Sequence, residues 1–270
     1  MTYKKSFFIS LILSGFLVLS GCNSYDKLLK SNDVTLKYRA ALEYFDKGNY
    51  AQAVPLLEDV YKFYIGTAQA ETVSYDLAYS YYKIGEYALA AFQFKTFADG
   101  YPLSKYTEDA NYYYAYCLYL DSPGMELDQA STKSAINAFQ LFADKYTQSK
   151  RVDECNKSID ALSNKLEQKE INNALLYFKI EQYKAAVWAI RNALEDYPAT
   201  KDKEHLSFLI VKSSYLYALN SVEEKKIDRF TSALEYYSDF KEKYLISTYN
   251  PELEVIVNNC NHNIQQLTKK

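Results

Sequence analysis

The chain has 270 residues, and its 31 Lys and Arg against 34 Asp and Glu give a formal net charge of −3 at pH 7. This mild acidity, without a block of basic residues, argues against nucleic acid as a partner. With 7 Gly and 5 Pro, the chain has few of the turn residues that a β-sandwich needs, whereas its 29 Tyr are many. The length suits one elongated domain or two compact ones.

The first residues have the order of an export signal. Lys4 and Lys5 supply positive charge, and an apolar run follows at residues 7–19. This run is shorter than the roughly 20 apolar residues that a membrane-spanning helix needs. It ends in Leu19-Ser20-Gly21-Cys22, which resembles the lipobox of exported bacterial lipoproteins.

The lipobox resemblance implies that residues 1–21 are a signal peptide and that Cys22 is lipidated. Residues 22–33 would then be a lipidated linker, and the mature chain would lose two positive charges and carry −5. Several acyl chains on one cysteine suffice to hold a protein at a membrane surface. An ordinary secretory signal with an incidental cysteine is the alternative.

An apolar pattern then recurs five times along the chain. Each copy starts at an alanine: Ala53, Ala90, Ala135, Ala186 and Ala233. Four residues later stand Leu57, Phe94, Phe139, Ile190 and Tyr237, and eleven residues later Tyr64, Tyr101, Tyr146, Tyr197 and Tyr244. Apolar residues at positions 0, 4, 7 and 11 lie on one face of an α-helix.

The spacing of the copies predicts the fold class. Successive alanines are 37, 45, 51 and 47 residues apart, a period typical of helical solenoids. The unit resembles the tetratricopeptide repeat, most completely in the second copy, where Gly85 suits the turn and Pro102 closes the second helix. We therefore predict an all-α, right-handed helical solenoid of about five tetratricopeptide-like helix pairs plus a C-terminal capping helix.

Extra residues lengthen particular parts of the array. Residues 120–129 lengthen the turn inside the third pair, and the charged, periodic segment 150–168 is expected to lengthen helices between the third and fourth pairs. Residues 223–228 do the same in the fifth pair, and 251–267 would form the cap. We divide the mature chain into N-terminal repeats at 34–149 and C-terminal repeats with the cap at 150–270.

In tetratricopeptide repeats the first helix of each pair lines a concave groove. By that resemblance, the predicted peptide-binding residues are Tyr38, Phe45, Tyr75, Tyr79, Tyr82, Tyr112, Tyr116 and Tyr119. Tyrosine offers a large apolar face and a hydroxyl that can bond a peptide backbone, so the set suits a peptide with aromatic side chains. Lys37, Arg39 and Lys83 are candidates to meet a terminal carboxylate. The alternative is ordinary packing between repeats.

The sequence offers little for catalysis. Three cysteines remain besides Cys22: Cys117, Cys155 and Cys260. Because their number is odd, we expect buried thiols, with a Cys155–Cys260 disulfide as the alternative. His205 and His262 have no carboxylate or cysteine at the sequence spacing that metal ligands need. No nucleophile elbow, phosphate loop or dinucleotide fingerprint is found. We expect no metal, no cofactor and no enzymatic activity.

The chain as a whole resembles the BamD-type lipoproteins of the outer-membrane β-barrel assembly machinery. The resemblance is carried by the lipobox, the repeats, Tyr101-Pro102-Leu103-Ser104 and Leu127-Asp128-Gln129 before the third alanine. It departs at the end, where the basic last helix of some members is shortened to Lys269-Lys270.

This resemblance implies a lipid-anchored scaffold on the periplasmic face of the outer membrane. Its C-terminal repeats would bind the barrel-forming subunit BamA, and its N-terminal groove would receive aromatic-ended segments of unfolded outer-membrane proteins. Two alternatives are a glycan-binding lipoprotein of the SusD type and a periplasmic repeat adaptor for envelope or cell-wall proteins. Trp188, the single Trp, falls at a predicted packing position and argues against the glycan-binding alternative.

Overall fold

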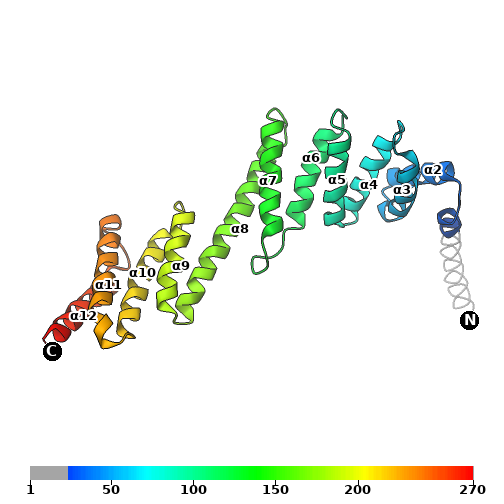
Figure 1. Cartoon of the computed structure of the whole chain (residues 1–270). Coiled ribbons are helices and arrows are strands. Elements are labelled where there is room, and N and C mark those ends of the chain that lie inside the picture. Colours follow the sequence, from blue (N-terminus) through cyan, green and yellow to red (C-terminus); the bar gives the residue numbers. More distant parts are fainter. Residues whose placement is uncertain (1–23, 270) are drawn as a thin grey trace, which may run out of the picture. The chain divides into compact units, whose positions relative to one another are not determined.

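The computed structural model describes residues 24–269, and in that part of the chain every regular element is a helix (Figure 1). A short helical stretch at 24–29 comes first. Three helix pairs follow: α2 (Val34–Asp46) with α3 (Tyr50–Tyr64), α4 (Ala70–Lys83) with α5 (Tyr87–Gly100), and α6 (Thr107–Leu120) with α7 (Ala130–Lys145). The remaining helices are α8 (Val152–Lys179), α9 (Tyr183–Asp196), α10 (Lys203–Leu219), α11 (Glu223–Lys243) and α12 (Asn250–Thr268). The predicted all-α solenoid of helix pairs is confirmed.

The chain divides into two compact units, Met1–Leu162 and Ser163–Lys270. The division falls inside α8, which at 28 residues is the longest helix described and contains most of the charged segment 150–168. It lies later than the boundary after residue 149 that the sequence suggested. The first unit therefore includes the start of α8, and the second includes its end.

The first unit is built on the predicted alanine register. Ala53, Ala90 and Ala135 are fully buried, as are the aromatic residues four positions later, Phe94 and Phe139. A small side chain at each alanine lets paired helices approach closely, while each buried aromatic ring stabilises the fold by about 1.5–3 kcal/mol. The start of α8 joins this core through Cys155 and Leu162.

The second unit repeats that arrangement with other side chains. Ala186, Ile190, Ala233 and Phe240 are buried in one cluster. The cap α12 adds Leu253, Ile256 and Cys260 to the cluster and begins with a proline in its first turn, where a missing N–H costs no helical hydrogen bond. The sequence placed this cap at 251–267, and the structure confirms it.

The turns inside the first, second and fourth pairs each contain a residue with positive φ. Gly48 has φ of 74° and Gly85 has φ of 86°, which glycine adopts without a clash of Cβ. The fourth pair has no glycine at this position, and Glu181 takes φ of 60° there. A side chain in that conformation costs about 1–2 kcal/mol.

The long turn of the third pair is held by its own side chains. The buried Gln129 amide donates to the carbonyl oxygens of Gly124 (2.7 Å) and Leu127 (3.0 Å). Its Oε1 accepts a hydrogen bond from the Thr132 hydroxyl at 2.7 Å. Asp128 Oδ1 accepts from the Ala130 N–H at 2.9 Å. The segment is therefore an ordered connection into α7.

Three further findings bear on the predictions. Cys117, Cys155 and Cys260 are free, buried thiols, and burial raises the pKa of Cys117 to about 12 and that of Cys155 and Cys260 to about 11. The Cys155–Cys260 disulfide is therefore not formed. Within residues 24–269, no helix combines the length and the apolarity that crossing a membrane requires. Cys22 and the signal segment lie outside the described residues.

Candidate functional site

The predicted groove residues come from α2, α4 and α6 of the first unit, and most of them contact one another. The ring of Phe45 on α2 lies 5.9 Å from that of Tyr79 on α4. Tyr82, one turn further along α4, lies 6.1 Å from Tyr116 on α6. Aromatic pairs at such distances contribute beyond the area that they bury. Tyr38 is the exception, because its ring packs on Tyr64 of its own repeat at 4.8 Å.

Helical spacing stacks the rings along each helix. Tyr75 and Tyr79 are nearly parallel, with ring centroids 6.3 Å apart. On α6, Tyr112, Tyr116 and Tyr119 form a longer stack with centroid distances of 5.7 and 5.9 Å. Side chains three or four residues apart lie above one another on a helix, which explains both stacks.

Tyr113 joins the two stacks, and the sequence did not identify it. Its ring lies 5.5 Å from Tyr79, 5.1 Å from Tyr82 and 5.3 Å from Phe94. Spacing along α6 assigns the groove to Tyr112, whereas Tyr113 is its neighbour and points towards α4. We call the connected set the tyrosine network; its members are Phe45, Tyr75, Tyr79, Tyr82, Tyr112, Tyr113, Tyr116 and Tyr119.

The members of the network differ in how deeply their side chains are buried. Tyr112 is only 5% exposed and packs on Phe139 and Phe142, so it supports its neighbours. The other members are half-buried. Each of these rings therefore keeps one part in the packing between repeats and another part open to solvent.

Burial and neighbouring charges favour the protonated form of two central hydroxyls of the network, those of Tyr75 and Tyr113. Burial raises the pKa of Tyr113 to about 12, and burial with the nearby Asp109 carboxylate raises the pKa of Tyr75 further. Arg151 pairs with Asp109 at 2.7 Å and lies over the Tyr112 ring at 4.3 Å. A protonated phenol can donate a hydrogen bond to a peptide carbonyl.

Lys83, one of the candidate cations, lies beside the network. Its ammonium group is 5.8 Å from the ring centroid of Tyr50, 5.9 Å from Tyr79 and 6.0 Å from Tyr82. Lys37 is buried and forms an ion pair with Asp59 at 2.6 Å, so it serves the packing of α2 on α3.

A buried carboxyl group lies near the first two repeats. Asp76 on α4 is 8% exposed, and burial together with the charge of Asp46 raises its pKa from 3.8 to about 7. The carboxyl is therefore half-protonated near neutral pH. Desolvation by burial is the main cause of this shift, because it disfavours the charged form of the carboxyl group.

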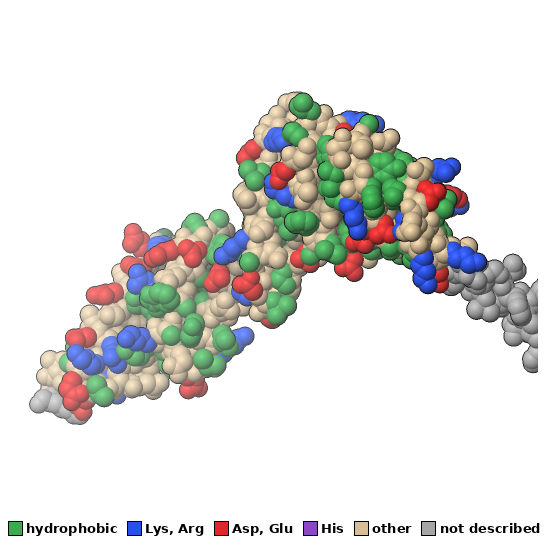
Figure 2. Space-filling view, turned by 45° about the vertical axis from the view of Figure 1, so that its right-hand side comes forward, with side chains coloured by type: hydrophobic (Ala, Val, Ile, Leu, Met, Phe, Trp, Pro, Cys, Tyr) green, Lys and Arg blue, Asp and Glu red, His purple; other side chains and the backbone are tan. Residues whose placement is uncertain are grey.

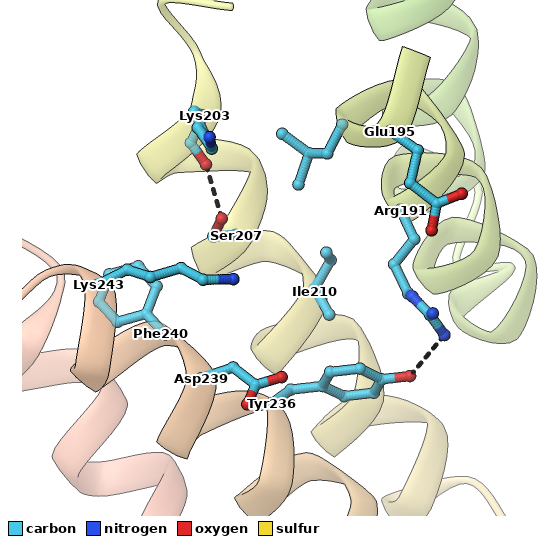
Figure 3. A pocket seen from close by; sticks show the side chains of 10 residues that line it. Arg191, Glu195, Lys203, Ser207, Ile210, Tyr236, Asp239, Phe240 and Lys243 are labelled. Atoms are coloured by element: carbon cyan, nitrogen blue, oxygen red, sulfur yellow. Dashed lines mark hydrogen bonds between the residues drawn. The ribbon is translucent and has the colours of Figure 1, made fainter. Parts of the chain in front are cut away.

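The second unit has a pocket of about 310 Å³ between α9, α10 and α11 (Figure 3). Its lining combines the apolar Leu194, Ile210 and Phe240 with charged residues of both signs. Arg191 donates to the Tyr236 hydroxyl at 3.4 Å across the pocket.

The surface view shows acidic and basic side chains interspersed over both units (Figure 2).

Trp188 does not lie where the sequence placed it. We expected a packing position, but the indole is 69% exposed on α9. Residues two positions apart lie on opposite sides of a helix. Ala186 and Ile190 both face the core, so Trp188 between them points away from it. Among the described residues, no group of three or more His, Cys, Asp or Glu side chains is arranged to hold a metal ion.

Comparison with known proteins gives a consistent result. A family model described as YfiO, outer membrane lipoprotein, matches residues 30–229. The outer membrane protein assembly factor BamD of Caulobacter vibrioides is 24% identical over 212 residues, which are 77% of this chain and 69% of that protein. BamD of Vibrio cholerae is 24% identical over 205 residues, covering 70% of this chain and 84% of that protein.

Two solved structures are also similar. The tetratricopeptide domain of P58(IPK) superposes with a TM-score of 0.40 at 14% identity, covering 91% of this chain and 69% of that one. A putative kinesin light chain of Podospora anserina with tetratricopeptide-like repeats gives a TM-score of 0.33 at 12% identity, covering 87% of this chain and 95% of that one.

Proposed function

The chain belongs to the YfiO family of outer membrane lipoproteins, and from this membership we propose that it is a non-enzymatic assembly factor for outer-membrane proteins. Lipid on Cys22 would tether it to the periplasmic face of the outer membrane. The first unit would hold unfolded segments of outer-membrane proteins, and the repeats at 150–270 would bind a barrel-forming subunit of the BamA type. The names of the two BamD relatives support the assembly role.

The observation that carries substrate binding is the tyrosine network. Half-buried rings from successive repeats contact one another, so they form a continuous apolar surface rather than isolated contacts. Rings already fixed by packing lose little entropy when a ligand binds. The hydroxyl groups of the network's tyrosines can in addition donate hydrogen bonds to the carbonyl groups of an extended chain. An unfolded segment with aromatic side chains matches both properties.

The test is peptide binding to a double variant, Tyr75→Ala with Tyr79→Ala. The probe is a synthetic outer-membrane-protein C-terminal peptide that ends in Phe, and isothermal titration calorimetry measures its dissociation constant. We expect at least a tenfold loss of affinity, because two stacked rings at the centre of the network are removed.

Two controls keep this result interpretable. Tyr236→Ala removes a half-buried tyrosine of the second unit and should leave the affinity unchanged. Circular dichroism must show that the double variant keeps its helicity, since Tyr75 also packs on Phe94 and Phe97. Equal affinity of the folded double variant and the wild type would refute substrate binding by the network.

The tether and the docking role have their own tests. Cys22→Ser should move the protein from the membrane fraction to the soluble periplasm, and a variant that stays firmly in the membrane would exclude the lipid tether. Affinity purification of the full chain from detergent-solubilised membranes should recover a barrel protein with periplasmic repeats. Retention of the protein on a starch or glycan matrix instead would favour the glycan-binding alternative.

A further inference from the structure

The fourth helix pair leaves open a helix face that is buried in the second pair. The two turns align Gly85 with Glu181, so Leu77, Ser80 and Tyr81 of α4 correspond to Asn173, Leu176 and Tyr177 of α8. The three α4 residues are buried. In α8, Asn173 is exposed, Leu176 is 53% exposed and Tyr177 is 43% exposed.

In the first unit a helix covers each corresponding face. The face of α4 packs on α3, where the Tyr81 hydroxyl donates to the Glu58 carboxylate. Helix α6 packs on α5 in the same way. Even the first helix, α2, is covered by the short stretch 24–29, whose Tyr25 ring lies 5.4 Å from Tyr44. The described residues of the second unit supply no such helix to α8.

The uncovered face is hollowed into a groove along α8 and α9, with a volume of about 480 Å³. Its apolar part includes Leu176, Tyr177 and the 69% exposed Trp188. Its charged residues are Glu170 and Asp196, and no Lys or Arg is among the lining residues. The groove thus combines an exposed aromatic surface with charged residues that are all acidic.

We propose that this groove binds an amphipathic helix of a partner protein that carries Lys or Arg beside its apolar face. A helix is the element that covers the same face elsewhere in the chain, since stacked repeats bury their faces on the next helix. Basic side chains would meet Glu170 and Asp196, which fixes the charge of the partner. The proposal rests on the docking role of the repeats at 150–270 and specifies a surface for it.

Trp188 makes the groove directly observable, because it is the single Trp of the chain. The probe is a stapled peptide with the sequence of α3 (Tyr50–Tyr64), the helix that covers the equivalent face of α4, with Glu58 and Asp59 both replaced by Lys. Titration into the full-length protein should shift the Trp188 emission to shorter wavelength as the indole is covered. The lysine peptide should bind at least tenfold more tightly than the peptide with the natural acidic sequence.

Protein variants locate the effect. Reversal of both charges, Glu170→Lys with Asp196→Lys, should lower the affinity for the lysine peptide at least tenfold. Phe92→Ala is the matched control: Phe92 is 65% exposed on α5 at the position equivalent to Trp188, and its loss should leave the titration unchanged. The absence of an emission shift in wild-type protein, or an equal response of the charge-reversed protein, would overturn the proposal.

If the groove binds something other than a basic helix, the titrations give different results, and each of these results also overturns the proposal. A shift that depends on protein concentration without peptide would identify a second copy of the chain. A shift with N-acetylglucosamine oligomers would identify a sugar. Affinity purification separates the underlying role: if wild-type protein recovers the barrel subunit while the lysine peptide does not bind, only this inference fails. If no barrel subunit is recovered, the docking role itself fails.

Discussion

The two units use the same helix pair but place their aromatic side chains differently. In the first unit, tyrosines on α4 and α6 contact one another between repeats. In the second unit, the positions on α8 that correspond to Tyr75 and Tyr79 hold the aliphatic Ile171 and Leu175. Exposed aromatic side chains there include Tyr177 on α8 and Trp188 on α9. Repeat packing therefore fixes the core positions and leaves the outward positions free to differ between the units.

The largest expected effect tests the shared core. Phe94→Ala in the first unit should lower the free energy of unfolding by about 3–5 kcal/mol, and Ile190→Ala in the second by about 2–5 kcal/mol, because both side chains are fully buried. Urea titration followed by circular dichroism measures both. Phe92→Ala, on the same helix as Phe94 but exposed, should cost no more than about 0.5 kcal/mol. A small loss for Phe94→Ala would mean that the repeat register is wrong.

The next effect concerns Asp76, a buried carboxyl group of the first unit. The pKa of Asp76 is raised to about 7, whereas the unfolded chain has the ordinary value of 3.8. The folded state therefore binds a proton at the Asp76 carboxyl more tightly than the unfolded chain does. The free energy of unfolding is consequently highest below about pH 4 and falls as the pH rises to 7. The corresponding residue of α8 is an amide, Asn172.

Asp76→Asn should remove this pH dependence. Its gain in unfolding free energy over wild type should grow between pH 4 and 7 and level off above, at on the order of 3 kcal/mol. Urea titrations at pH 4, 6 and 8 measure the trend. A constant difference across these pH values would contradict the raised pKa.

A smaller effect compares the turns of the two units. Gly85→Ala should destabilise the protein by about 1 kcal/mol through backbone strain alone, since no atom lies within 4 Å of the added Cβ. Glu181→Gly should act in the opposite direction and stabilise by up to about 1 kcal/mol, because it relieves a positive φ. Thermal melting of both variants gives the signs, and a stabilising Gly85→Ala would disprove the argument.

The smallest effect concerns Trp188. Because the indole is 69% exposed, Trp188→Ala should change the free energy of unfolding by no more than about 0.5 kcal/mol. Chemical denaturation followed by circular dichroism measures it. A loss of several kcal/mol would show that the indole packs in the fold and would count against its role in the groove.

Much of the fold could be predicted from spacing. The recurring alanines gave the helix pairs and the core, because a buried face must repeat with the helical period. The charged, periodic segment 150–168 predicted longer helices between the third and fourth pairs, where α8 lies, and the cap predicted at 251–267 is α12. Of the site, the sequence identified most of the tyrosine network but not Tyr113, whose contacts cross from α6 to α4.

Side-chain environments were the part that spacing could not give. Lys37 was a candidate for a carboxylate ligand but is engaged with Asp59. Trp188 was expected to pack, yet it is exposed. In both cases the residue lies on the helix that was predicted, and the neighbouring helix decides its environment.

The sequence by itself determined the helix pairs and their core register, since each depends on the order of residues within a short segment. Only the tertiary structure decided which rings form one network, that Asp76 is buried, and that the face of α8 beside Trp188 is open. Those properties depend on which helix lies beside which face, and contacts between distant segments leave no period in the sequence.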